Sequence, residues 1–296
     1  GGQQGTFTIT RSCYSGPFYC MSSGRDPSLE WIQDVNFNSD PNLSGSSSYS
    51  EYLDSPLTVS RGGSYPITIT PGFLQGTRNE YYKVWIDLNH DGDFSDGGEQ
   101  VFSAGPSTTS VSGTITIPVT ATKATTRMRV SMRYNGIPSS CGTYGNGEVE
   151  DYALNIRCNL VTSTLDNTGN GTLRNVSACA DDGEDILFAS TLNNQILLIN
   201  STQLTVDGQW KWMATAGSNI EIKANTATRV LNIPAGFSAE IQNLKITGGT
   251  ATNGSAIDNL GTLTLRDSKI YRAASTGTAL RNKGPLTVYG NCEIRN

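Results

Sequence analysis

The residues best suited to chemistry lie in one acidic stretch, residues 85–99, which reads WIDLNHDGDFSDGGE. Oxygen-bearing side chains alternate along it as in the first half of a calcium loop, and Gly92 stands at the sharp turn. Oxygen ligands select calcium over transition metals, and His90 alternates away from the ligand side. The stretch predicts a Ca²⁺ site formed by these residues: Asp87, Asn89, Asp91 and Asp93, completed by Asp96 or Glu99.

The stretch differs from an EF-hand. Gly98 stands where the closing glutamate belongs, and strand residues replace the flanking helices. An acidic hairpin turn that binds no ion is the alternative, since aspartate, asparagine and glycine are ordinary turn residues. Repulsion among the closely spaced carboxylates favours the cation.

Catalytic groups are scarce elsewhere in the chain. His90 is the only histidine, and the sequence contains no nucleophile elbow, Walker motif or dinucleotide-binding glycine motif. The net charge of −5 and the dispersed 21 lysines and arginines argue against a nucleic-acid partner. No apolar run reaches the roughly 18 residues of a membrane span. We therefore expect neither an enzyme nor a protein that binds nucleic acid or spans a membrane.

The elements around the acidic stretch read as short β-strands. Residues 1–157 alternate apolar and polar side chains between turn clusters, for example at 64–70 and 113–117, which is typical of a β-sandwich. Residues 127–133 place three apolar side chains on one face and three arginines on the other. We expect the arginine face to be solvated and paired with nearby carboxylates: Glu148, Glu150 and Asp151.

Residues 158–296 repeat themselves every 23 to 27 residues. Apolar residues alternate around one asparagine and one glycine in 257–265 and again in 280–288. Coils of this length predict a right-handed parallel β-helix of about five coils, so the whole chain is expected to be all-β. Two ladders of inward side chains are expected to hydrogen-bond from coil to coil: Asn232, Asn259 and Asn282 in one, and Asn243, Asp267 and Asn291 in the other.

Six cysteines, at positions 13, 20, 141, 158, 179 and 292, form an even set without CxxC spacing. Disulfides formed in an oxidising compartment account for this set better than a zinc site does. Spacing alone leaves the pairing open, because six cysteines allow many arrangements.

A second motif, GEVEDY at 147–152, follows the acidic stretch. Together with VWID at 84–87, RMRV at 127–130 and Cys141, it makes residues 19–156 resemble the GEVED domain of secreted bacterial proteins. The resemblance implies an exported protein of a kind that often carries a type IX sorting tail, and it implies a disulfide between Cys20 and Cys141.

Residues 171–188 resemble the entry coil of the parallel β-helices found in bacterial surface proteins and adhesins. Because Cys158 and Cys179 lie beside this entry, we expect them to form a second disulfide. Other pairings remain open: Cys13 with Cys20 as the alternative to the first disulfide, and Cys292 with Cys13 or with a neighbouring molecule.

These features favour a non-enzymatic structural protein of the bacterial cell surface that assembles into a filament or coat. The expectation rests on a last coil, 293–296, without a capping segment, unless a sorting tail followed it. A monomeric glycan-binding adhesin is the alternative, with Trp210 and Trp212 as the binding face. A polysaccharide lyase is the third candidate, and it would need the charged residues of the coils: Asp258, Arg266, Asp267, Lys269, Arg281, Lys283 and Glu293.

Overall fold

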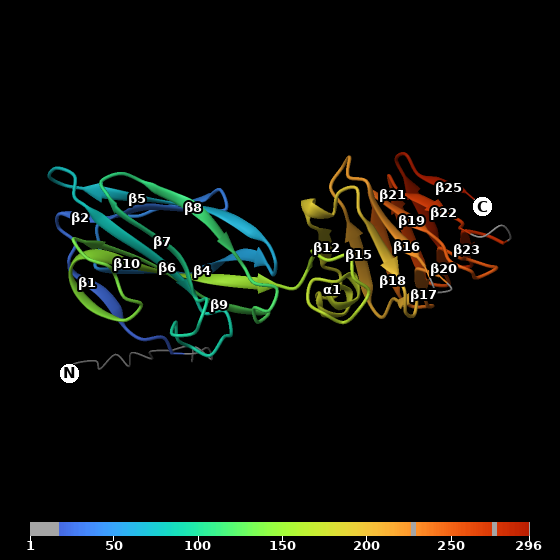
Figure 1. Cartoon of the computed structure of the whole chain (residues 1–296), viewed down its shortest axis with the longest axis horizontal. Helices are drawn as coiled ribbons and strands as arrows, with labels where there is room; N and C mark the ends of the chain where they lie inside the picture. Colours follow the sequence, from blue (N-terminus) through green and yellow to red (C-terminus); the bar gives the residue numbers. More distant parts are fainter. Residues whose placement is uncertain (1–17, 226–228, 274–276, 296) are drawn as a thin grey trace, which may run out of the picture.

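The computed structural model describes residues 18–225, 229–273 and 277–295. Figure 1 shows two β-rich units that follow one another along the long axis, the first in blue to green and the second in yellow to red. The first unit contains two sheets, and the second is a parallel β-solenoid of about five turns, as the sequence repeat predicted. Within the described residues, no helix has the length and apolar character that a membrane span requires.

The first unit is a sandwich of a six-stranded and a four-stranded sheet. The larger sheet has the order β1-β10-β9-β6-β7, and β4 also pairs with β10. Its strands are β1 (Ser22–Asp26), β4 (Tyr49–Ser60), β6 (Glu80–Ile86), β7 (Gln100–Ser107), β9 (Ala124–Tyr134) and β10 (Gly142–Arg157). The smaller sheet has the order β3-β2-β5-β8. Its strands are β2 (Glu30–Phe37), β3 (Asp40–Leu43), β5 (Ser64–Phe73) and β8 (Val111–Thr116).

Alternation along the strands produces the core that the two sheets share. Met128, Val130 and Met132 of β9 are fully buried, as their alternation predicted. They belong to one cluster with apolar residues of the smaller sheet, among them Ile32 and Ile69. The two sheets therefore pack face to face around a single apolar layer.

The arginine face of β9 is less solvated than the sequence predicted, because Arg127 and Arg133 are half-buried and Arg129 is buried. Arg129 is 1% exposed, and its guanidinium donates two hydrogen bonds, each 2.7 Å long, to the Asp151 carboxylate. Arg127 donates to the same carboxylate at 3.1 Å. Asp151 was expected as a partner, but burial was not, because the segment at Cys20 lies over this face and accepts a hydrogen bond from Arg129.

Three parallel sheets form the walls of the solenoid. The first contains β11 (Leu160–Val161), β12 (Asp185–Phe188), β15 (Gln209–Met213), β18 (Ser238–Gln242), β21 (Thr262–Arg266) and β24 (Leu286–Tyr289). The second contains β13 (Ile196–Ile199), β16 (Ile220–Ala224), β19 (Leu244–Thr247), β22 (Lys269–Tyr271) and β25 (Glu293–Arg295). The third contains β14 (Leu204–Thr205), β17 (Leu231–Ile233), β20 (Ile257–Asn259) and β23 (Leu280–Asn282). A one-turn 3-10 helix, η1 (Ser190–Leu192), follows β12.

A short helix closes the end of the solenoid that faces the sandwich (Figure 1). Helix α1 (Leu173–Cys179) is N-capped by the hydroxyl of Thr172. Val176 is buried in the solenoid core, and the Ser177 hydroxyl accepts a hydrogen bond from the Trp212 indole at 3.2 Å. The expected entry to the solenoid is present in residues 171–188, and helix α1 within it covers the apolar end of the first coil.

The first predicted ladder is correct for two of its three residues. Asn259 and Asn282 are paired in register, and Asn259 Nδ2 donates to Asn282 Oδ1 at 2.6 Å. Asn232 pairs instead with Asp258, while Ile233 is the residue opposite Asn259. Because side chains alternate along β17, Asn232 lies on the outward face and not in the inward column.

The second predicted ladder lies at a bend and does not point into the core. Asn243 and Asp267 have φ angles of 57° and 46°, and Gly290 has a φ of 67° at the equivalent turn of the next coil. Asp267 is exposed, and its Oδ1 accepts a hydrogen bond from the Asn291 backbone nitrogen at 2.8 Å. Asparagine and aspartate serve here because they tolerate the left-handed backbone and hydrogen-bond across the bend.

The joint between the two units is short and heavily bonded. A disulfide between Cys158 and Cys179 ties the end of β10 to the end of α1. The Asn159 side chain bridges the units, since its Oδ1 accepts from the Ser60 hydroxyl at 2.7 Å and its Nδ2 donates to the Asp185 carbonyl at 3.0 Å. Two ion pairs flank this bridge: Arg157–Glu184 at 3.4 Å and Lys123–Asp181 at 2.8 Å.

Candidate metal centre

The acidic stretch connects β6 to β7 and folds around the carboxylate of Asp87, which is fully buried. Its Oδ1 accepts hydrogen bonds from the backbone nitrogens of His90 at 2.6 Å and Asp91 at 3.2 Å. Its Oδ2 accepts from the Gly92 backbone nitrogen at 3.1 Å and from the Tyr19 hydroxyl at 2.7 Å. Both oxygens are therefore engaged by donors, and Asp87 organises the turn.

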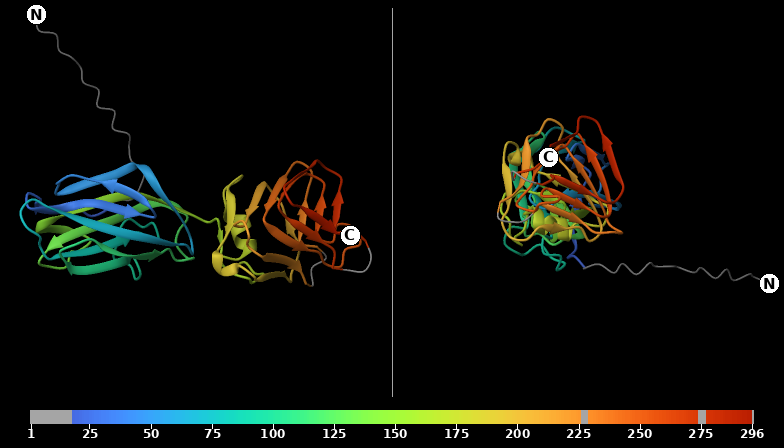
Figure 2. Two further views of the ribbon diagram at one scale, coloured as in Figure 1. Left: turned by 90° about the horizontal axis from the view of Figure 1, so that it is seen from above. Right: turned by 90° about the vertical axis from the view of Figure 1, so that its right-hand side faces the viewer.

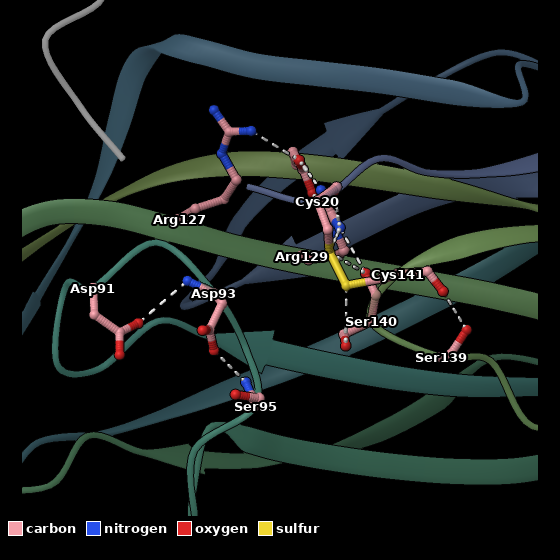
Figure 3. Close-up of a disulfide and its surroundings, with 10 residues drawn as sticks. Cys20, Asp91, Asp93, Ser95, Arg127, Arg129, Ser139, Ser140 and Cys141 are labelled. Carbon is pink, nitrogen blue, oxygen red and sulfur yellow. Dashed lines mark hydrogen bonds and ion pairs between the residues drawn. A yellow bond between two sulfur atoms is a disulfide. The ribbon is translucent and has the colours of Figure 1, made fainter. Parts of the chain in front are cut away.

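Three exposed carboxylates gather on the outside of this turn. Carboxylate oxygens of Asp91, Asp93 and Asp96 lie within 4.8 Å of one another. Figure 3 shows Asp91 accepting a hydrogen bond from the Asp93 backbone, at 3.2 Å, and Asp93 accepting one from the Ser95 backbone, at 2.7 Å. Carboxylates this close repel one another, and a hard divalent cation bound among them would offset that repulsion.

Asn89 extends the same cluster. Its Nδ2 donates to Asp91 Oδ2 at 2.9 Å and to Asp96 Oδ2 at 2.7 Å. The hydrogen bond from Asn89 holds the pKa of Asp91 below its ordinary value. Because an amide carries an oxygen as well as a nitrogen, rotation of this side chain would present an oxygen ligand to a cation.

Glu99 supports the loop from within and lies apart from the exposed cluster. It is 1% exposed, and its carboxylate accepts hydrogen bonds from the backbone nitrogens of Leu88 at 2.9 Å and Asp96 at 3.3 Å. Burial raises the pKa of Glu99 above its ordinary value. The six predicted ligands thus divide into two that hold the loop and four that converge at its surface: Asp87 and Glu99 in the first group, and Asn89, Asp91, Asp93 and Asp96 in the second.

Aromatic residues that sequence reasoning missed pack beneath the loop, together with two arginines of β9. The rings of Tyr19 and Phe94 stack with centroids 5.2 Å apart. The Arg127 guanidinium lies 4.6 Å from the Tyr19 ring centroid, and the Arg129 guanidinium lies 5.1 Å from that of Phe94. The available signal was Phe94 itself, an aromatic residue among the charged residues of a loop.

Figure 3 shows the Cys20–Cys141 disulfide beside Arg129. Arg129 Nη1 donates to the carbonyl oxygens of Cys20 at 2.9 Å and Ser140 at 2.6 Å, so one arginine holds both ends of the bridge. Both predicted disulfides are present in the structure. The two remaining cysteines stand as follows: Cys13 lies outside the described residues, and Cys292 forms no disulfide within them.

The two glutamates of the GEVEDY motif point into the sandwich and do not pair with the arginines, contrary to expectation. Glu148 accepts a hydrogen bond from the Ile32 backbone nitrogen at 2.9 Å, and Glu150 accepts one from the Tyr152 hydroxyl at 2.6 Å. Burial raises the pKa of Glu148 to about 8 and that of Glu150 to about 7. Within this motif, Asp151 therefore pairs with the arginines, and the two glutamates are buried in the interior of the sandwich.

The two tryptophans that were considered for glycan binding differ in how far they are buried. Trp212 is 1% exposed within the solenoid core and cannot stack on a sugar. Trp210 is partly exposed, and its indole nitrogen donates to Asp207 at 3.2 Å. Trp210 and Asp207 line an open cavity of about 400 Å³ together with Gln209 and Phe237.

Three of the charged residues considered for lyase chemistry form ion pairs between coils. Asp258 pairs with both Arg229 and Arg281, and Arg266 pairs with Glu240. The others are placed as follows: Asp267 and Lys269 line a separate cavity of about 320 Å³, Lys283 is exposed, and Glu293 pairs with Arg295. Ion pairing accounts for four of these residues, and the absence of catalysis stays a prediction.

Fold and site together define a two-unit β-protein, a sandwich with a buttressed acidic loop followed by a parallel solenoid. Residues 81–155 match the family model of the GEVED domain, so the chain contains a GEVED domain followed by a β-solenoid. The matched region runs from β6 into β10 and includes the acidic loop. None of the curated proteins is similar enough to the chain to count as a match. The domain, the solenoid and the disulfides point to an extracellular protein of the surface type.

Proposed function

We propose that this chain is a rigid, non-catalytic structural segment of a bacterial cell-surface protein, in which the GEVED sandwich and the solenoid act as one elongated body. Figure 2 shows the two units in line, with the C-terminus at the end away from the sandwich. The observation that carries the proposal is the Asn159 bridge beside the Cys158–Cys179 disulfide. A flexible linker would lack such contacts, because domains joined by polar linkers move relative to one another by default.

Limited proteolysis tests this rigidity. Trypsin cleaves after arginine, and Arg157 stands at the joint, where it is paired with Glu184. We expect trypsin to spare Arg157 in the native chain and to cut there at least about tenfold faster when Cys158→Ala and Cys179→Ala remove the bridge, because local opening costs about 2–4 kcal/mol less without it. Rapid separation of the native chain into two fragments at Arg157 would overturn the proposal.

The proposal includes one Ca²⁺ ion bound at the acidic loop. Three exposed carboxylates within 4.8 Å of one another, with an amide beside them, supply the hard oxygen ligands that calcium prefers. A bound ion would stabilise the sandwich by about 2.7 kcal/mol when free calcium is 100 times its dissociation constant. Stabilisation by a bound ion suits a surface protein that is exposed to millimolar calcium.

Thermal melting with calcium and with EDTA tests the ion site. We expect calcium to raise the melting temperature of the native chain and to leave that of the Asp93→Asn, Asp96→Asn variant unchanged. Asp54→Asn, which removes an exposed carboxylate outside the loop, serves as the control. Equal melting temperatures of the native chain in calcium and EDTA, together with elemental analysis that finds no metal, would refute the site.

A second candidate function, glycan binding, is favoured by the cavity beside Trp210. An aromatic edge next to carboxylate and amide acceptors is an arrangement that can stack on a sugar ring and hold its hydroxyls. Tryptophan fluorescence titrated with surface polysaccharides would change in the native chain and not in Trp210→Leu. An unchanged spectrum across an array of glycans would remove this candidate.

A further inference from the structure

Tyr19 connects the acidic loop to the residue that precedes a disulfide cysteine. Its hydroxyl donates to Asp87 Oδ2 at 2.7 Å, and Asp87 in turn accepts the backbone nitrogens that shape the loop. Its ring stacks on Phe94, which lies between two of the carboxylates that converge at the loop surface. One side chain therefore fixes the loop at two points, and the next residue in the chain is Cys20.

The position of Tyr19 depends on the Cys20–Cys141 bridge and on the arginines beneath it. Arg129 holds the carbonyl oxygens on both sides of the bridge and is itself fixed by two hydrogen bonds to the buried Asp151. The Arg127 guanidinium, which also bonds Asp151, packs over the Tyr19 ring. Contacts thus run without interruption from the disulfide, through Tyr19 and Asp87, to the exposed carboxylates.

We infer that the Cys20–Cys141 disulfide and cation binding at Asp91, Asp93 and Asp96 are thermodynamically linked through Tyr19, so that the loop is a redox-sensitive calcium site. The inference rests on the proposed calcium site and adds Tyr19 as its positioning residue. With the bridge intact, Tyr19 holds the loop in the shape that gathers three repelling carboxylates. Without the bridge, calcium binding must also order Tyr19 and its segment, which weakens the affinity.

The linkage is reciprocal because binding free energies around a closed cycle must balance. A dithiol reductant transfers two electrons and two protons to the bridge, so that Cys20 and Cys141 become thiols while the reductant forms its own disulfide. Bound calcium is therefore expected to shift this equilibrium toward the disulfide. A typical coupling free energy corresponds to a change in affinity of roughly 5- to 150-fold.

Calorimetric titration of the full chain with CaCl₂ tests the inference. We expect Cys20→Ser with Cys141→Ser to weaken calcium binding by roughly 5- to 150-fold, and Tyr19→Phe, which removes only the hydroxyl, to weaken it by a smaller factor. Cys158→Ser with Cys179→Ser, which removes the other disulfide, is the matched control and should leave the affinity within about twofold of the native value. Circular dichroism would establish that each variant is folded.

A second readout keeps the test decisive if the double cysteine variant fails to fold. The native chain is treated with dithiothreitol with and without CaCl₂, and free thiols are alkylated and counted peptide by peptide. Calcium should protect Cys20 and Cys141 and leave Cys158 and Cys179 unaffected. Unchanged calcium affinity in folded Tyr19→Phe, or equal reduction with and without calcium, would overturn the linkage alone. No calcium heat in the native chain would overturn both the linkage and the calcium site.

Discussion

A carboxyl group buried in an apolar interior holds its proton more tightly than one in water, since burial penalises the charged form. Three glutamates of the sandwich show this effect most strongly. Burial raises the pKa of Glu148 to about 8 and those of Glu80 and Glu150 to about 7, from an ordinary value of 4.5. The folded chain therefore binds protons at these sites more strongly than the unfolded chain does.

Stability of the sandwich should consequently fall as the pH rises from 5.5 to 9. These groups contribute fully below the unfolded pKa and lose their contribution as the pH passes through 7 to 8. We expect the melting temperature, measured at constant calcium concentration, to fall by at least about 2–4 °C, the shift that 1 kcal/mol produces in a domain of this size.

Glu148→Gln should flatten this pH dependence, because glutamine keeps an acceptor for the Ile32 backbone nitrogen but does not ionise. Glu51→Gln, at an exposed position, should leave it unchanged. Carboxyl groups with lowered pKa values, such as Asp166 and Asp258, stay ionised throughout this range and do not interfere. A melting temperature that rises between pH 6 and 9 would contradict the interpretation.

The same residues show what a sequence can predict about individual side chains. The spacing of oxygen-bearing residues in 87–99 located the acidic loop, in which Asp91, Asp93 and Asp96 lie together. It could not tell that Asp87 and Glu99 hold the loop while the others converge outside it, because that division depends on backbone turns. Nor could it predict the burial of Arg129, whose covering segment is 109 residues away in sequence.

At the scale of elements, the close approach of β10 to its neighbours depends on Gly147. This residue has a φ of 126°, and a Cβ added there would lie 2.1 Å from the Met132 carbonyl oxygen on β9. The Gly147 carbonyl oxygen itself lies 1.9 Å from where a Cβ of Gly24 would be. Glycine is therefore required at position 147 for β9 to pair with β10 as it does, and at position 24 for β1 to do so.

We expect Gly147→Ala to destabilise the sandwich by at least about 1–3 kcal/mol, from backbone strain alone. Gly145→Ala, two residues earlier on β10, has no atom within 4 Å of the added Cβ and should change stability by no more than about 0.5 kcal/mol. Urea denaturation of both variants provides the comparison. Equal stabilities would show that β10 can move away from β9 without loss.

The solenoid was the most predictable part of the fold, because the regular spacing of its apolar residues reveals the repeat. The register was less predictable. The strand pairing places Asn232 opposite Asp258 and therefore outside the ladder, so the step from Asn232 to Asn259 is one residue longer than the step between paired residues of β17 and β20. Helix α1 was not predicted, although Leu173 and Val176 stand three residues apart, as on one face of a helix. Two apolar positions in so short a segment do not establish a helical period, and the need to cover the end of the first coil is what favours the helix.

At the scale of the whole molecule, assembly into a filament or coat stays a prediction. Parallel strand edges can pair with those of a second copy wherever nothing covers them. Light scattering over a concentration series should then give a mass that rises above the 31.6 kDa of one chain. A constant monomer mass, with no fibres visible on native cells by electron microscopy, would rule out assembly and favour the monomeric adhesin.

The central claim is that the sandwich and the solenoid form one rigid body, and a distance between them tests it most directly. Spin labels attached through bioorthogonal residues at the exposed positions Thr108 and Lys283 leave every cysteine intact. Double electron–electron resonance should give a single narrow distance distribution in the native chain, and a broader one when Cys158→Ala, Cys179→Ala and Asn159→Ala remove the bridge. A broad or multiple distribution in the native chain would show that the two units move independently and would contradict the account.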